Sequence, residues 1–179
     1  MKNLLRFQAL GASLVFFVAA AGAAAQVPGW KTHSYPADGF SVSLPADPQI
    51  QSQDMQLPAG GKAETRLYQL GVGDAGLMIG MFHAGAMVPG KTPDQVLQDG
   101  KNGALAKTQA HLISEKKITL GDAAGLEMVA ENPTLHIKAR LFVAGTRVYT
   151  IMEVYPIGKP FAHAEEFLDS FRIVPVEAK

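Results

Sequence analysis

Short runs in which apolar and polar residues alternate, separated by Gly and Pro, dominate this chain. In FSVSL, Phe40, Val42 and Leu44 alternate with serines, which is typical of a strand with one buried face. Asp38-Gly39 before it suits a tight turn, so residues 31–35 are predicted to form a hairpin with this strand. Residues 63–73 and 76–86 predict a second hairpin.

A helix is predicted over residues 91–108. Thr92 is a suitable N-cap, and Gln95 three residues later completes the pattern of a capping box. Gly100 and Gly103 interrupt the segment, and each costs about 1 kcal/mol relative to Ala inside a helix. The helix is therefore expected to form but to be only marginally stable.

Four further strands follow the helix without any intervening helical pattern. Gly-Asp, Asn-Pro and Ala-Gly-Thr turns separate them, and such short connections imply antiparallel neighbours. Parallel nucleotide-binding folds, which need helical crossovers, are thereby disfavoured. The predicted strands are residues 112–121, 123–133, 135–145 and 147–156.

The segment AEEFLDSFRIV near the C-terminus has the spacing of an amphipathic helix that begins at Pro160. Apolar residues at helical spacing anchor a core more often than they form a site. Ser170 has no nucleophile-elbow motif around it and is interpreted as structural. The expected stripe is Phe161, Ala164, Leu168 and Phe171, with Phe167 on its flank and Glu165, Glu166 and Asp169 on the other side.

The N-terminus has the pattern of a secretory signal peptide. Lys2 and Arg6 precede an apolar run, and the small residues before Gln26 fit the signal peptidase substrate. We predict cleavage between Ala25 and Gln26, which removes residues 1–25 and leaves 26–179 as a single α+β domain. A retained signal anchor is the alternative, and the Ala-x-Ala processing pattern disfavours it.

These features predict a periplasmic or secreted protein with no stable membrane span after processing. The chain has no cysteine, so it can carry neither a lipoprotein anchor nor a disulfide. Without Lys2 and Arg6, 14 basic residues remain against 16 acidic ones, a net charge of −2. That balance disfavours nucleic acid as a partner. An envelope or secreted protein is the expected partner, and the oligomeric state is left open.

Motifs that carry catalysis are not found along the chain. The histidines lie far apart and form no HxxxH pair, and no phosphate-binding loop is present. Glu127 and Glu131 alternate with apolar residues and are predicted to face water. We therefore expect no enzyme activity, no catalytic residue and no cofactor. A hydrolase built from residues that converge only in space remains a third possibility.

One cluster carries ligands that suit copper(I). Met78, Met81, His83 and Met87 lie within ten residues, and exported copper proteins use thioether and imidazole ligands. Strand alternation places Met81 and His83 on one face and Met78 on the other. We interpret the methionines as core-filling side chains. A periplasmic copper-handling protein is the alternative function.

The order of features, from FSVSLP through the long meander to FLDSFRI, resembles the PsbP/Mog-like α/β/α sandwich superfamily. The resemblance covers nearly all of residues 26–179. It implies an α+β fold in which two main helices cover a curved, mostly antiparallel sheet. It also implies an exported, non-catalytic accessory or binding module of the cell envelope, acting on a protein or a small ligand. The residues that carry it are Arg147, Tyr149, Phe167, Ser170, Phe171 and Arg172.

Overall fold

The structure is a computed structural model, and it describes residues 29–56, 62–84 and 90–176. The predicted signal peptide and its cleavage site at Ala25 and Gln26 lie outside the described residues. Within the described ranges, no helix is long and apolar enough to cross a membrane.

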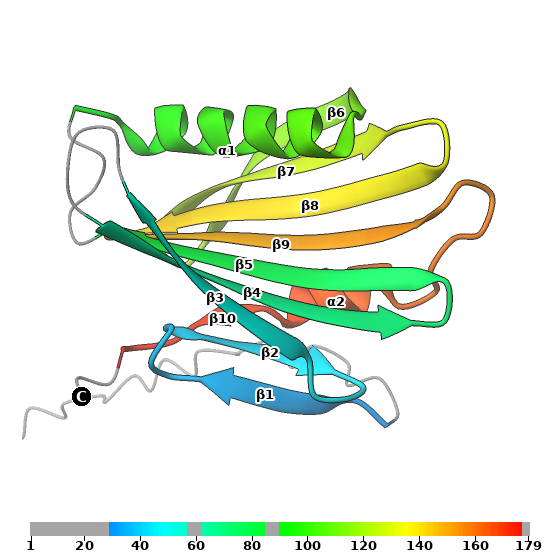
Figure 1. The fold of residues 1–179 in the computed structure, drawn as a ribbon, viewed down its shortest axis with the longest axis horizontal. Coiled ribbons are helices and arrows are strands. Elements are labelled where there is room, and N and C mark those ends of the chain that lie inside the picture. Colours follow the sequence, from blue (N-terminus) through cyan, green and yellow to red (C-terminus); the bar gives the residue numbers. More distant parts are fainter. Residues whose placement is uncertain (1–28, 57–61, 85–89, 177–179) are drawn as a thin grey trace, which may run out of the picture.

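Two antiparallel sheets form the framework (Figure 1). The larger sheet has seven strands in the order β3-β4-β5-β9-β8-β7-β6, and the smaller has three in the order β1-β2-β10. The large sheet consists of β3 (Gln49–Gln56), β4 (Lys62–Val72), β5 (Ala75–Ala84), β6 (His111–Leu120), β7 (Ala123–Glu131), β8 (Leu135–Ala144) and β9 (Arg147–Pro156). The small sheet consists of β1 (Lys31–Tyr35), β2 (Phe40–Leu44) and β10 (Arg172–Ile173).

The predicted hairpins β1–β2 and β4–β5 and the four-strand meander β6–β9 are all present. Tight turns with glycines at positive φ connect several of these pairs, including Gly39 (φ 76°) and Gly145 (φ 58°). Two strands were not predicted. β3 is a polar edge strand that lacks apolar alternation, and β10 has only two residues.

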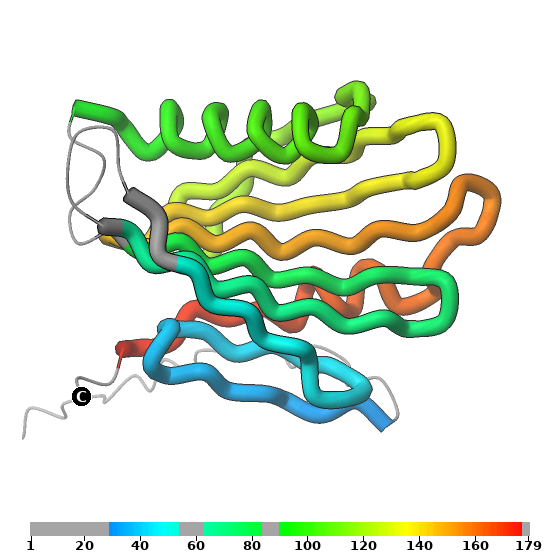
Figure 2. The backbone as a smooth tube through the Cα atoms, in the orientation of Figure 1, coloured from blue at the N-terminus to red at the C-terminus, as the bar shows by residue number. Residues whose placement is uncertain are grey.

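Helix α1 (Pro93–Thr108) covers one face of the large sheet (Figure 2). The capping box is confirmed, because the Gln95 amide donates to Thr92 Oγ1 at 3.3 Å and the Thr92 amide donates to Gln95 Oε1 at 2.8 Å. Leu97 of this helix is buried against a core formed by β7, β8 and β9. This core includes Met128, Ile137 and Leu141.

The opposite face of the large sheet is covered by helix α2 (Ala164–Ser170) together with the small sheet. Three aromatic side chains from this layer, Phe40, Phe167 and Phe171, are at most 1% exposed. They pack with Tyr68 and Tyr149 of the large sheet, which confirms that the C-terminal segment belongs to the core. The second face is therefore covered by more than the predicted helix.

The predicted length of the last helix was wrong at both ends. Helix α2 begins at Ala164, so Phe161 lies outside it and packs on Trp30 with ring centroids 6.4 Å apart. Phe171 follows the helix in an extended conformation (φ −65°, ψ 133°). Ser170 is structural, because its hydroxyl donates to the Phe167 carbonyl at 2.7 Å and accepts from the Ser43 amide at 3.0 Å.

Candidate functional site

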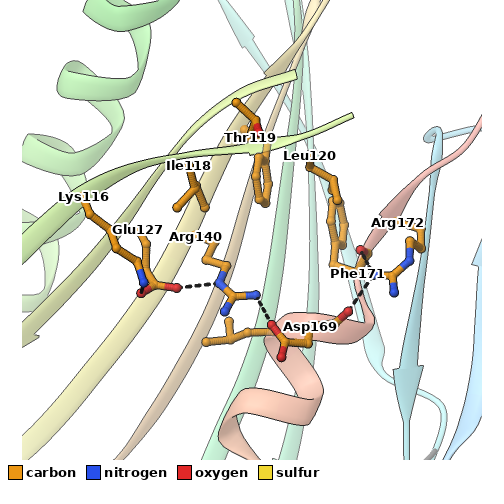
Figure 3. A pocket seen from close by; sticks show the side chains of 11 residues that line it. Lys116, Ile118, Thr119, Leu120, Glu127, Arg140, Asp169, Phe171 and Arg172 are labelled. Atoms are coloured by element: carbon orange, nitrogen blue, oxygen red, sulfur yellow. Dashed lines mark hydrogen bonds and ion pairs between the residues drawn. The ribbon is translucent and has the colours of Figure 1, made fainter. Parts of the chain in front are cut away.

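A groove of about 470 Å³ opens beside α2 on the face of the large sheet opposite α1 (Figure 3). Helix α2 packs against β2 and β9, and the groove lies over β6, β7 and β8. Strand β6 borders one side of the groove, and the end of α2 together with β10 borders the other. Its lining divides into a set of charged side chains, called here the polar wall, an apolar floor, and Arg172, an arginine outside that set.

The polar wall consists of Lys116, Glu127, Arg140 and Asp169, which form a continuous ion-pair network. Glu127 accepts from Arg140 Nε at 2.7 Å and lies 2.9 Å from Lys116 Nζ. Arg140 Nη1 donates to Asp169 at 2.6 Å. The network joins three strands to α2, so it fixes the position of the helix over the sheet.

The prediction that Glu127 faces water was wrong, because this residue is only 6% exposed. Burial alone raises the pKa of its carboxyl, but hydrogen bonds from Lys116 and Arg140 and the charge of Lys138 outweigh burial and leave the pKa below its usual value. Burial likewise favours loss of the Arg140 proton, and the hydrogen bonds to Asp169 and Glu127 instead raise the pKa of Arg140. Glu127 and Arg140 therefore both stay charged at neutral pH.

The apolar floor depends on a glycine. Phe142 of β8 lies opposite Gly125 of β7, and a Cβ atom at Gly125 would come within 2.6 Å of the Phe142 ring. Without that Cβ, the Phe142 ring stacks parallel to Phe171, with centroids 6.1 Å apart and an angle of 2° between the ring planes. Ile118 and Leu120 of β6 line the groove beside these rings and are partly buried.

Arg172 lies at the end of the groove formed by β10. Its Nη1 donates to the backbone carbonyls of Asp169 at 2.6 Å and Phe171 at 2.8 Å. No carboxylate of the described residues lies within ion-pair distance of its guanidinium. The lining therefore has three cations, Lys116, Arg140 and Arg172, against two anions, Glu127 and Asp169, a net charge of +1.

The methionine–histidine cluster is divided by the sheet. Met81 is 2% exposed and belongs to the core beneath the small sheet, with Leu77 and Ile79. Met78 packs on the opposite face, where its sulfur accepts from Gln69 Nε2 at 3.7 Å. His83 is two residues from Met81 along β5, and Met87 lies outside the described residues.

Metal-ligating side chains do not gather elsewhere in the described ranges, where no group of three or more His, Cys, Asp or Glu residues could hold a metal ion. Three histidines lie instead near single carboxylates: His33 is 3.3 Å from Asp47, and His136 is 3.0 Å from Glu131. The third, His163, lies 3.9 Å from Glu166.

Comparisons with known proteins find no matching family model and no matching curated protein. Among solved structures, the chain is similar to the solution structure of cyanobacterial PsbP (CyanoP) from Synechocystis sp. PCC 6803. The TM-score is 0.55 at 12% sequence identity, and the match covers 87% of this chain and 98% of that chain. The chain has a PsbP-like fold. The resemblance in the sequence is confirmed at the level of the fold.

In this PsbP-like fold, the groove combines residues that are distant in the sequence. Hairpin pairing alone places Glu127 opposite Arg140 and Lys116, so part of the polar wall could have been found by counting from the turns. Asp169 and Arg172 could not, because the docking of α2 brings them to the sheet. Each carboxylate of the wall is held in an ion pair with at least one cation of the same wall.

Proposed function

We propose that the chain is an exported, non-catalytic accessory or binding module of the cell envelope, and that it binds a protein or a small ligand in the groove beside α2. The observation that carries this proposal is the pairing of a fixed polar wall with an apolar floor on a face that α2 leaves open. Clefts that bind ligands typically measure about 300–1,000 Å³ and combine apolar walls with a few placed polar groups. The groove has both properties.

The ion-pair network favours binding because it holds the groove in one shape. Arg140 bridges Glu127 of the sheet to Asp169 of the helix, and its guanidinium is largely shielded, with a side chain 16% exposed. A groove held in this way needs little ordering when a ligand enters, which lowers the entropic cost of association. The alternative function in copper handling receives no comparable support, because Met78 and Met81 face opposite sides of the sheet.

Site-specific photocrosslinking in the native host tests this function. A photoreactive side chain at Lys116, which lines the groove with a side chain that is 66% exposed, should form a discrete adduct with an envelope component that mass spectrometry identifies. The same side chain at Lys107, exposed in the last turn of α1 on the opposite face of the sheet, is the matched control and should form none. Equal adducts from both positions, or adducts from Lys107 alone, would contradict binding at the groove.

A further inference from the structure

We propose that the groove captures the free C-terminus of a peptide whose last side chain is apolar, with Arg172 holding the terminal carboxylate. This inference rests on the proposed binding function and specifies the ligand of the same groove. Three features of the lining carry it: the position of Arg172, the apolar surface beside it, and the mixture of donors and acceptors along the polar wall.

Arg172 is already held in position for an anion. Two backbone carbonyls, those of Asp169 and Phe171, fix one terminal nitrogen of its guanidinium. The remaining N–H groups have no partner among the described residues, and the side chain belongs to an exposed residue that lines the groove. A planar fork of this kind binds a carboxylate through two parallel hydrogen bonds.

The apolar contact lies next to this cation. Leu120 and Ile118 present partly exposed side chains, and the stacked rings of Phe142 and Phe171 close the floor beneath them. A peptide that ends in an apolar residue places its carboxylate and its last side chain within a few ångströms of each other. The juxtaposition of Arg172 with Leu120 in one groove matches that pair of groups (Figure 3).

The polar wall distinguishes a peptide from a simple hydrocarbon acid. Lys116 and Arg140 can donate hydrogen bonds, and Glu127 and Asp169 can accept them, so the wall offers partners for both the carbonyl and the amide of a peptide unit. A hydrocarbon chain would cover the exposed atoms of these charged groups without offering them a hydrogen bond. The net charge of +1 also suits one carboxylate, whereas a ligand with several negative charges would meet Glu127 and Asp169.

A titration with two matched peptides tests the inference. The probes are acetyl-Gly-Ser-Ala-Leu with a free carboxylate and the same peptide with a C-terminal amide, each added to the purified protein. We expect the acid to bind about tenfold or more tightly than the amide, because only the acid forms a charge-assisted pair with Arg172. Backbone NMR signals of Thr119, Leu120 and Arg172 should shift on binding.

Two charge variants complete the test. Arg172→Gln should weaken binding of the acid about tenfold, to the level of the amide. Lys107→Gln removes the same charge on the opposite face and should leave binding of the acid unchanged. If Arg172→Gln does not fold, the comparison of acid and amide on the parent protein still decides the matter.

Equal binding of acid and amide, absence of binding by either, or signal shifts confined to other surfaces would overturn the inference. The outcome is separable from that of the proposed function. Crosslinks from Lys116 together with equal binding of the two peptides would leave the groove as the binding site and reject the C-terminal carboxylate as its ligand.

Discussion

Glu153 is a carboxylate enclosed in the core, and its replacement by glutamine should change how stability depends on pH. The residue lies on β9 between Leu77 of β5 and Lys138 of β8, and it is 1% exposed. Its Oε2 atom is buried without a hydrogen-bond partner. Lys138, its neighbour across the strands, instead donates to Glu165 of α2.

Burial is the main cause of an elevated pKa at this carboxyl, which reaches about 7 from an ordinary value of 4.5. The nearby charge of Glu165 raises the pKa further, and Lys138 and Arg140 lower it in part. The folded state therefore holds this proton more tightly than the unfolded state does. At about 1.4 kcal/mol for each tenfold change in proton affinity, the difference corresponds to about 3 kcal/mol.

Whether the free energy of unfolding rises or falls with pH depends on how many protons the folded and unfolded states bind at Glu153. Well below pH 4.5, Glu153 is protonated in both the folded and the unfolded state, so its ionisation does not lower the free energy of unfolding. As the pH rises through 4.5 toward 7, the unfolded state ionises first, and the free energy of unfolding falls. Glu153→Gln, which is neutral at every pH, should avoid this loss and exceed the parent by about 2–3 kcal/mol at pH 8.

Urea denaturation of the parent and of Glu153→Gln at pH 5 and pH 8 measures this effect, because contributions from other titrating groups cancel in the difference between the two proteins. Glu166→Gln is the matched control, since its side chain on α2 is 41% exposed and the change removes no buried carboxylate. A stability difference between Glu153→Gln and the parent that is the same at both pH values would refute the reasoning.

Three further outcomes are expected. Phe171→Ala should cost about 3–5 kcal/mol, because the ring is 1% exposed and its loss leaves a cavity; thermal unfolding close to that of the parent would contradict this. Gly103→Ala should raise stability in urea by about 0.5–1 kcal/mol, because its Cβ would meet nothing within 4 Å, whereas Gly100→Ala should bring no gain, because its Cβ would lie 2.8 Å from a β8 side chain. Mass spectrometry of the exported protein should show Gln26 as its first residue, and an intact Met1 would exclude cleavage.

Local patterns in the sequence were sufficient for the hairpins and for α1. Phe40, Val42 and Leu44 alternate with serines in β2 and are fully buried, as a strand with one buried face requires. Thr92 and Gln95 form the predicted capping box at the start of α1. These elements depend on neighbours only a few residues apart, so a single sequence contains what is needed to predict them.

Elements that lack apolar periodicity, or that depend on distant contacts, were not predictable in this way. The polar strand β3 has no apolar periodicity, and it forms by pairing with β4 at the edge of the sheet. Alternation along β7 correctly placed the Glu127 side chain on the opposite face of the sheet from the apolar side chains next to it. It could not show that α2 shields the face on which Glu127 lies. The buried network of Glu127, Arg140 and Asp169, and with it the groove, becomes visible only when residues 116–127, 140–142 and 168–172 are brought together.

The end of α2 at Ser170 explains why the groove exists at all. A helix of seven residues is about 10 Å long, whereas seven strands spaced about 4.8 Å apart make a sheet roughly 29 Å across. The chain leaves the helix because Phe171 enters the core in an extended conformation and Arg172 pairs with Ser41 of β2. A longer helix would continue past this point and could not hold Phe171 and Arg172 in these positions. The same backbone transition thus shortens the helix, closes the floor with Phe171 and places the guanidinium of Arg172 at the groove.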